Sequence, residues 1–509
     1  MKIFTAKQIY EADKATEAKQ QISSIDLMER AADQVFQWLD QRLQGAQVTI
    51  HIFCGIGNNG GDGMALGRML LNKGYSVKSY IVNYSEKRSK CFLINYGRYK
   101  NTTKDWPLMM KSEQDFPTLN PRDIIVDCIF GIGLNKPVDS WVKKLIMHIN
   151  KVKAFVLSID VPSGLFVDTP TPDKDAVIKA TATLTFQAPK LVFFLPETNQ
   201  FSETLEIIDI GLDEQYLAET PVEANLILKN EVKSMYLPRD KFSHKGNFGH
   251  TYIIGGSYGK IGAVSLAAKS ALKSGAGKVT AYLPKCGYSI IQTSIPEAMV
   301  ITDAGENSIN DFSLPEDITH IGIGPGLGTE KETVKGFLSF LKKLKTAMVI
   351  DADALNILAS NKKALSDVPP LSILTPHPGE LERLIGKWEN DFDKLQKTKS
   401  FSKKYDVIVV IKGAHTITVY KDHLFVNTTG NPGMATPGSG DVLTGLITGL
   451  IAQGYQPLIA AIFGVYLHGS AGDISVQQTG YQSLLAGEIA DFIGDAYIEL
   501  FRREDELPK

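Results

Sequence analysis

Predicted strands that end in glycine-rich or polar loops and lead into helices recur in both halves of the chain. Residues 48–54 form a mostly apolar run, pass into the glycine-rich segment 55–63, and precede the apolar positions of a helix and a second strand at 76–82. Parallel strands need a crossover between them, and a helix is the usual crossover. The alternation therefore predicts an α/β fold.

The length predicts two domains, because a chain of 509 residues is longer than one domain usually grows. Both halves alternate strands with helices, but their glycine-rich loops differ in spacing, so no internal repeat is visible. Proline and charged residues in the region 213–240 favour a connection between the halves. We expect domains at 1–220 and 228–509, the first a Rossmann-like three-layer sheet domain.

Composition narrows the class of protein. Apolar residues make up 43% and charged residues 22%, and 54 Lys and Arg face 56 Asp and Glu, which argues against nucleic acid binding through bulk charge. The N-terminus lacks a signal-peptide core, and the longest apolar stretch, 457–467, is too short to span a bilayer. The four cysteines have no zinc spacing. We expect a cytoplasmic protein with buried thiols, no nucleic acid or membrane partner, and a homo-oligomeric state.

Three loops in the first half follow successive predicted strands. They are the segment 57–63, Asp127 with 131–137, and Asp160 with 161–164. Ligands of open parallel sheets lie at the carboxyl ends of strands, so these loops should converge. Taken singly, Asp127 and Asp160 are also compatible with structural carboxylates that bond loop amides. The glycine spacing is not Gly-x-Gly-x-x-Gly, which argues against ordinary hydride transfer.

The second half contains a glycine-rich loop at 430–440 followed by Asp441 and helical apolar spacing. A helix N-terminus after such a loop collects free N–H groups and suits a phosphate. Asp441 would then take a proton from a substrate hydroxyl that attacks the phosphate. The alternative is that Asp441 caps the helix.

Two histidines of the second half follow predicted strands. His377 lies in the segment 375–380, and His415 follows Lys412 after the strand expected at 407–411. Either one, taken alone, is compatible with an ordinary loop histidine.

These motifs carry a family resemblance over nearly the whole chain. The first half resembles the NAD(P)H-hydrate epimerases in the segments 57–63, Asp127 with 131–134, and 160–165. The second half resembles the ADP-dependent NAD(P)H-hydrate dehydratases of the ribokinase-like fold in the segments 244–246, 262–263, 324–328, 351–354, 375–380, 412–416 and 438–445. The order of the halves is that of the bifunctional hydrate-repair enzymes. Pro437 departs from the family's usual glycine and removes an amide donor.

The resemblance implies that the first domain interconverts the R and S forms of NADH or NADPH hydrated at C6 of the ring. Asp160 would be the acid/base residue, and potassium would be held by Asn59, Asp127 and Ser163, which are hard oxygen donors. The remaining hydrate-binding residues would be Asn58, Asn59, Gly60, Gly61, Asp62, Gly131, Ile132, Gly133, Leu134, Asn135, Lys136 and Pro137.

For the second domain, the resemblance implies that ADP phosphorylates the C6 hydroxyl of the S hydrate, with Asp441 as the base. Phosphate then leaves, and AMP and the reduced cofactor remain. Ala263, Gly326 and His377 would line the hydrate pocket with Asp441, and Glu380 would hold magnesium through water. The nucleotide would be bound by Lys412, Gly413, Ala414, His415, Thr416, Asn431, Gly438, Ser439 and Gly440.

A second functional class stays open at this point. Ribokinase-like folds mostly phosphorylate small molecules, and Rossmann-like domains also serve as binding modules without catalysis. The alternative is therefore a vitamin or sugar kinase fused to such a module. Free phosphorylated product rather than orthophosphate would mark it.

Overall fold

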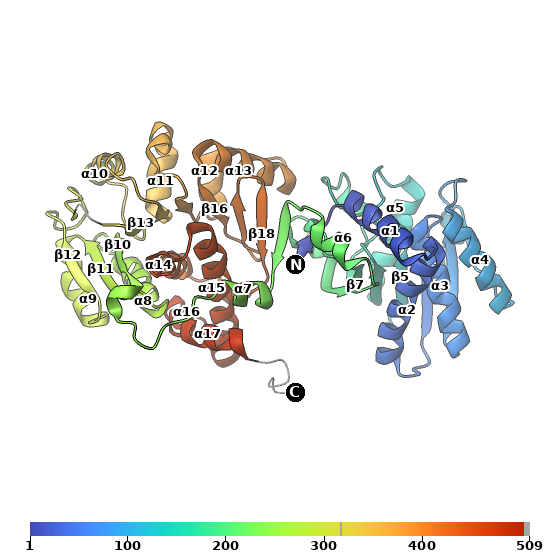
Figure 1. The fold of residues 1–509 in the computed structure, drawn as a ribbon. Coiled ribbons are helices and arrows are strands. Elements are labelled where there is room, and N and C mark those ends of the chain that lie inside the picture. The colour runs from blue at the N-terminus through green and yellow to red at the C-terminus, as the bar shows by residue number, and fades with distance from the viewer. Residues whose placement is uncertain (316–317, 503–509) are drawn as a thin grey trace. The chain divides into compact units, whose positions relative to one another are not determined.

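The computed structural model describes residues 1–315 and 318–502 (Figure 1). The chain divides into an N-terminal unit, Lys2–Val222, and a C-terminal unit that begins at Glu223 and includes Met1. The predicted second domain reached residue 509, and its last part, 503–509, lies outside the described residues.

A parallel sheet forms the centre of the N-terminal unit. Its strand order is β4-β3-β2-β5-β6-β7-β8. The strands are β2 (Thr49–Cys54), β3 (Ser76–Val82), β4 (Leu108–Met110), β5 (Ile124–Cys128), β6 (Phe155–Ile159), β7 (Ala180–Phe186) and β8 (Ser202–Ile208). The helices are α1 (Ala6–Gln20), α2 (Ser24–Leu43), α3 (Asn58–Lys73), α4 (Lys90–Thr102), α5 (Ser140–Lys151) and α6 (Glu214–Glu219).

Helices cover both faces of this sheet. Successive side chains of a strand point to opposite faces, so Ile52 joins a core with α2 and α3, whereas Phe53 joins a second core with α5. The predicted α/β class and the three-layer arrangement of this unit are confirmed.

The glycine-rich segment after β2 is shorter as a loop than expected. We expected a loop through Gly63, but α3 begins at Asn58, so most of the segment is the first turns of a helix. Gly60 permits this, because a Cβ there would collide with the carbonyl oxygen of Gly55. The start of α3 therefore lies directly against the end of β2.

The C-terminal unit contains a mixed sheet. Its strands follow the order β9-β18-β17-β16-β15-β14-β13-β10-β11-β12, antiparallel between β16 and β17 and between β17 and β18. They are β9 (Ala224–Ile227), β10 (His250–Ile254), β11 (Lys278–Leu283), β12 (Met299–Thr302), β13 (His320–Ile323), β14 (Met348–Ile350), β15 (Ile373–Leu374), β16 (Ile408–Ile411), β17 (Ile417–Tyr420) and β18 (His423–Asn427).

Helices lie on both sides of this sheet in Figure 1, with α10–α13 on one side and α8 and α14–α17 on the other. Their bounds are α7 (Lys229–Met235), α8 (Ile261–Lys273), α9 (Tyr288–Ser294), α10 (Lys331–Leu341), α11 (Ala352–Ser360), α12 (Pro378–Ile385), α13 (Asp391–Tyr405), α14 (Ser439–Ala452), α15 (Pro457–Thr479), α16 (Ala486–Asp491) and α17 (Ile493–Phe501).

The region 213–240 is more ordered than the predicted connection. It contains α6, β9 and α7, and β9 pairs in parallel with β18, with Leu226 opposite Val426. The boundary between the two units, between Val222 and Glu223, falls inside this region, and a short apolar run there, 224–227, completes a sheet of the C-terminal unit.

Helix α15 is longer than the apolar stretch that we recognised in the sequence. It spans 23 residues and is long and apolar enough to cross a bilayer, but 78% of its apolar window is buried inside the protein. A buried core helix has these same properties. Cys54, Cys91 and Cys128 are buried as expected, whereas Cys286 is half-buried.

Candidate active sites

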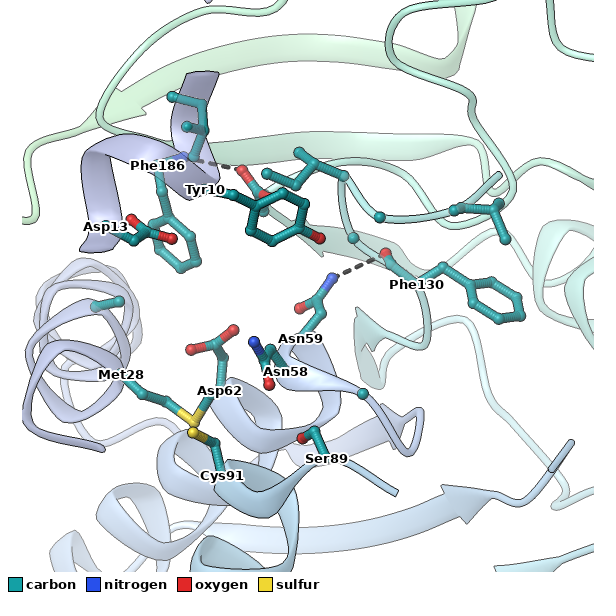
Figure 2. A pocket seen from close by; sticks show the side chains of 18 of the residues that line it. Tyr10, Asp13, Met28, Asn58, Asn59, Asp62, Ser89, Cys91, Phe130 and Phe186 are labelled. Atoms are coloured by element: carbon teal, nitrogen blue, oxygen red, sulfur yellow. Dashed lines mark hydrogen bonds between the residues drawn. The ribbon is translucent and has the colours of Figure 1, made fainter. Parts of the chain in front are cut away.

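The three predicted loops of the N-terminal unit meet around a cavity of about 880 Å³ (Figure 2). Residues 57–59 and Asp62 of the α3 start, the loop 129–139, and Asp160 all line it. Figure 2 shows Asn58, Asn59 and Asp62 on one wall, with Tyr10 and Asp13 of α1 on the other. The sequence predicted the convergence of the loops but not the contribution of α1.

Asp127, at the end of β5, organises two of these loops. Its buried carboxylate accepts hydrogen bonds from Ser158 Oγ at 2.8 Å, from Ser163 N at 2.8 Å and from Ser163 Oγ at 2.5 Å. Burial raises the pKa of Asp127, and the bonds from Ser163 and Ser158 oppose that rise. Ser163 Oγ in turn accepts a bond from Phe130 N at 2.8 Å. Asp127 thus joins the loops after β5 and β6.

Asn59 lies on the cavity wall that the start of α3 forms (Figure 2). Its Nδ2 donates to the carbonyl oxygen of Phe130 at 2.8 Å (Figure 2). The same Nδ2 donates to the carbonyl oxygen of Ile159 at 2.9 Å. Its Oδ1 is buried without a hydrogen-bond partner among the residues that the structure describes. Buried polar atoms are normally paired, so this oxygen marks a place where a ligand or cation is expected.

Asp160 follows β6 in a left-handed backbone conformation, with φ at +66°. This conformation costs conformational energy in residues other than glycine, so it persists only where the surrounding structure fixes the backbone. Asp160 Oδ1 accepts from Lys190 Nζ at 2.7 Å and from Phe186 N at 3.3 Å. Lys190 is fully buried and also donates to Thr185 Oγ1 at 2.6 Å. Lys190 was not among the predicted site residues, because a lone lysine after a strand carries no motif.

Two further carboxyl groups that line the same cavity, Asp13 and Asp62, have raised pKa values. Burial, the neighbouring Asp160 and Glu17 raise the pKa of Asp13 to about 6, although Lys190 opposes the rise. Burial, Asp160 and Asp13 raise the pKa of Asp62 well above its ordinary value. Tyr10, one turn before Asp13, also has a raised pKa because of burial and of these carboxylates. The cavity therefore brings several carboxyl groups together near a buried ammonium group, and burial and their mutual repulsion favour the protonated form of Asp13 and Asp62.

The candidate site of the C-terminal unit lies at the start of α14. Gly438 caps this helix with φ at +91°, and Asp441 falls in its first turn. A Cβ on Gly440 would lie 3.0 Å from Lys412 Nζ and 3.6 Å from Asp351 Oδ2. The structure thus brings Lys412, predicted to bind nucleotide, to the helix end that carries Asp441.

Asp351, at the end of β14, is the centre of a charged network there. It is 2% exposed, and it accepts from Lys412 Nζ at 2.7 Å and from Thr444 Oγ1 at 2.8 Å. Burial and then Asp351 raise the pKa of Asp441 to about 7, and Lys412 opposes the rise. Lys412 bonds to Asp351 rather than to Asp441. Asp441 is therefore a partly buried carboxyl group whose pKa lies near neutral pH, and this proton affinity suits a general base.

The predicted nucleotide loop 412–416 is a tight turn. Thr416 Oγ1 donates to Gly413 O at 3.1 Å, Ala414 is exposed, and His415 Nδ1 lies 3.1 Å from the carbonyl oxygen of Asn427. The turn is therefore closed by its own residues.

The second predicted nucleotide segment is anchored to α15. Asn431 Nδ2 donates to Asp473 Oδ1 at 2.8 Å, and Gly430 N donates to Asp473 Oδ2 at 2.9 Å. Ser439 Oγ lies 3.4 Å from the Nε2 of His468, a buried histidine whose pKa is lowered to about 4 by burial and by Lys412. No sequence motif marks Asp473 or His468, because both lie within the apolar pattern of α15.

The residues predicted for the hydrate pocket fall into two groups. A Cβ on Gly326 would lie 3.2 Å from Ala263 Cβ, so these two positions adjoin. His377 caps α12, and its Nε2 lies 3.2 Å from Glu380 Oε1. Burial raises the pKa of Glu380, and the backbone bond from His377 and the charge of Lys412 oppose that rise. His377 and Glu380 are thus tied to one another in a capping box.

Comparison with known proteins covers both units. A family model described as NAD(P)H-hydrate dehydratase matches residues 251–494, and one described as YjeF-related protein N-terminus matches residues 24–192. A solved structure of an ADP/ATP-dependent NAD(P)H-hydrate dehydratase from Bacillus subtilis is 27% identical, with a TM-score of 0.45, and covers 54% of this chain and 97% of its own.

Two full-length relatives share the order of the units. The bifunctional NAD(P)H-hydrate repair enzyme Nnr of Moorella thermoacetica is 36% identical, covering 97% of this chain and 96% of the relative. The enzyme of the same name from Escherichia coli is 32% identical, covering 91% of this chain and 88% of the relative. Since both family models and these relatives span nearly the whole sequence, the chain belongs to the family of bifunctional NAD(P)H-hydrate repair enzymes.

Proposed function

We propose that the protein repairs hydrated NADH and NADPH, with the R and S hydrates interconverted in the N-terminal unit and the S hydrate dehydrated in the C-terminal unit at the expense of ADP. The observation that carries this proposal is the presence of two separate acid–base sites in one chain. One is Asp160 in the cavity of about 880 Å³, and the other is Asp441 at the start of α14.

In the epimerase site, Asp160 acts as the base that opens and recloses the ring at C6. The ammonium group of Lys190 lies 2.7 Å from Oδ1 and is a direct ion-pair partner of this carboxyl group. The N-terminus of α3, with Asn58, Asn59 and Asp62 at the cavity wall, and the loop 131–137 would hold the cofactor, because helix N–H groups suit its phosphates.

In the dehydratase site, Asp441 takes the proton of the C6 hydroxyl while that oxygen attacks the β-phosphorus of ADP. AMP leaves, and the N–H groups at the start of α14 and the Lys412 ammonium stabilise the charge that develops on phosphate. Phosphate then departs from C6 and a proton from C5, so the C5–C6 double bond of the reduced ring is restored. Phosphorylation thus turns a poor leaving group into a good one.

The oxygens around Asn59 fit a potassium ion. Asn59 Oδ1 lacks a partner, and the carbonyl oxygens of Phe130 and Ile159 adjoin the same amide. Ser163 Oγ is close by, while both oxygens of Asp127 bond to the loops, so Asp127 would act mainly by placing Ser163. A bound cation would offset the negative charge of the cavity. Asp127→Ala should remove epimerase activity and potassium dependence together, and equal epimerase rates in potassium and tetramethylammonium salts would contradict this assignment.

Glu380 would hold magnesium through water. Among the described residues, no group of three or more His, Cys, Asp or Glu side chains could hold a metal ion. Magnesium commonly keeps several waters and uses one or two carboxylates beside substrate phosphates, which fits the buried carboxyl group of Glu380 near Lys412 and Asp351. Its contribution would be to neutralise phosphate charge.

The test is incubation with hydrated NADH and either ADP or ATP while the absorbance of the reduced ring is followed. Recovery of that absorbance with release of orthophosphate supports repair. A stable phosphorylated product would instead identify the small-molecule kinase that the motifs left open.

The division of labour is tested with Asp160→Asn on a mixture of R and S hydrates. Since Asp441 would act on the S form alone, this variant should consume S quickly and then slow to the uncatalysed rate of epimer interconversion. The parent protein should consume both in one phase. A single fast phase in Asp160→Asn would remove Asp160 from epimerisation or show that R is accepted directly, and chromatography of the residual hydrate distinguishes these outcomes.

A further inference from the structure

Helix α1 presents a polar face to the cavity of the N-terminal unit. Tyr10, Asp13 and Glu17 are three or four residues apart, so they lie on one side of the helix, and all three line the cavity. Figure 2 shows Tyr10 and Asp13 on the wall opposite Asn59 and Asp62. The wall formed by α1 therefore contributes two carboxyl groups of its own, Asp13 and Glu17.

The surroundings of Asp13 and Asp160 differ. Asp160 Oδ1 bonds to Lys190, Phe186 N and, at 3.5 Å, Thr185 Oγ1. Over residues 1–315 and 318–502, Asp13 has no hydrogen bond and no ion pair shorter than 4.0 Å, although the positive charge of Lys190 reaches it. Two carboxyl groups in one cavity with such different neighbours are suited to different roles, one as the proton acceptor and the other as the proton donor.

Asp62 is less suited to that role. It lies in the first turns of α3, where the resemblance places the cofactor phosphates, and burial keeps its pKa well above the ordinary value. A carboxyl that stays protonated donates a hydrogen bond but does not give up and regain a proton in each cycle. Asp13 has a pKa of about 6, which allows both steps near neutral pH.

We propose that Asp13 is the second acid–base residue of the epimerase site, the proton donor to ring nitrogen N1 while Asp160 receives the proton of the C6 hydroxyl. This inference rests on the proposed epimerase function of the N-terminal unit.

The proton and electron balance is complete with these two side chains. Asp160, as a carboxylate, takes the hydroxyl proton; the O–H electrons form the C6 carbonyl, the C6–N1 bond breaks, and N1 receives its proton from Asp13. The resulting aldehyde rotates about the C5–C6 bond. N1 then attacks the other face of C6, Asp160 returns its proton to the oxygen, and Asp13 regains the proton from N1. No oxidant, reductant or second substrate is needed.

The test measures epimerisation of the purified S hydrate by chromatography without nucleotide, with the enzyme-free rate subtracted. Asp13→Asn should lower kcat by about 10²-fold with little change in KM, because it removes a proton donor and leaves the cavity volume nearly unchanged. Asp13→Glu should restore part of the loss. Glu11→Gln, an amide substitution on the outer face of the same helix, is the matched control, because Glu11 is exposed and does not line the cavity.

The pH profile separates proton donation from a structural role. The groups facing Asp13 are Tyr10 and Glu17 of its own helix, Asp62 of α3, Cys91 of α4, and Asp160 with Lys190. The parent kcat should fall as the pH rises past about 6, where Asp13 loses its proton, and Asp13→Asn should lose this alkaline limb.

An unchanged kcat in Asp13→Asn, or an unchanged alkaline limb, would overturn the proposal. If Asp13→Asn does not fold, the proposal is tested with the pH profile of the parent protein and with Asp13→Glu. A parent rate that is independent of pH between 5 and 8 would also overturn the proposal. Failure of the proposed function is distinct, since the parent protein itself would then not epimerise the S hydrate.

Discussion

The two candidate sites place their central carboxylates in opposite electrostatic settings. In the N-terminal unit, Asp160 has the fully buried Lys190 ammonium group at 2.7 Å. In the C-terminal unit, the corresponding cation, Lys412, bonds at 2.7 Å to Asp351 instead. Asp441 is therefore beside a second carboxylate, and its pKa rises to about 7.

This difference suits the two reactions. In the proposed mechanism, ring opening at C6 needs a base in the N-terminal unit, and Asp160 there has the Lys190 ammonium group as a direct ion-pair partner. Attack on ADP brings two anions together, and a base whose proton affinity lies near neutrality takes the hydroxyl proton efficiently. Both sites also contain a non-glycine residue in the left-handed backbone conformation. In the N-terminal unit it is Asp160 itself, with φ at 66°, and in the C-terminal unit it is Ala352, next to Asp351, with φ at 48°.

The largest expected effect is on dehydration. Asp441→Asn should lower the rate of ADP-dependent dehydration by about 10²-fold or more while nucleotide binding persists, because the amide cannot take the proton. Stopped assays for AMP and for the reduced ring measure it, and epimerisation should be unaffected. Turnover close to that of the parent would exclude Asp441 as the base.

The next effect concerns the buried ammonium group of the N-terminal unit. Lys190→Met should cost about 3 kcal/mol of stability and most of the epimerase activity, because it leaves Asp160 as an unpaired, largely buried charge. The double variant with Asp160→Asn removes that charge, so it should regain stability without regaining activity. Chemical denaturation of each variant measures the free energy of unfolding. A double variant no more stable than Lys190→Met would show that the loss of stability does not come from leaving Asp160 without its ion-pair partner.

A smaller effect should appear in the pH dependence of dehydration. After burial, the charge of Asp351 is the main cause of the raised pKa of Asp441. Asp351→Asn should therefore shift the midpoint of the pH–rate profile of dehydration to lower pH, by about one pH unit. The rate rises with pH because the base must be ionised. Thr444→Val, which removes a bond to Asp351 but no charge, is the matched control and should leave the midpoint nearly in place.

The sequence was informative where chemistry and periodicity coincide. The α/β class, the strand-end loops around Asp127 and Asp160, and the helix after Asp441 all followed from apolar runs next to glycine and aspartate. The family assignment was confirmed by relatives over the full length. The roles of individual residues, potassium binding and magnesium binding remain predictions.

The remainder depended on tertiary contacts that local patterns do not encode. Lys190 reaches Asp160 across 30 positions, and α1 adds Asp13 from 147 residues before Asp160 in the chain. The start of α3 at Asn58 was missed because glycines predict a loop, whereas here they permit close packing of a helix on a strand. Strand β9 was missed because its four residues complete a sheet formed mainly by distant strands.

The smallest expected effect has the opposite sign to that of Lys190→Met. At pH 3 and below, Asp441 is mostly protonated in both the folded and the unfolded protein, because even its ordinary pKa is 3.8. As pH rises from about 4 to about 7, the unfolded chain loses this proton while the folded protein retains it, so stability is lost through this window and the loss is complete above it. Asp441→Asn has no such loss, and it should stabilise the C-terminal unit at pH 8 by on the order of 1 kcal/mol, since part of the side chain is solvated. Calorimetry should therefore show nearly equal melting temperatures at pH 3 and a rise of about 3 °C at pH 8. Asp495→Asn, at an exposed position of the same unit, should show no such dependence. A destabilised Asp441→Asn at pH 8 would mean that the ionised carboxylate has a favourable partner in the folded protein, and the contrast between the two sites would then fail.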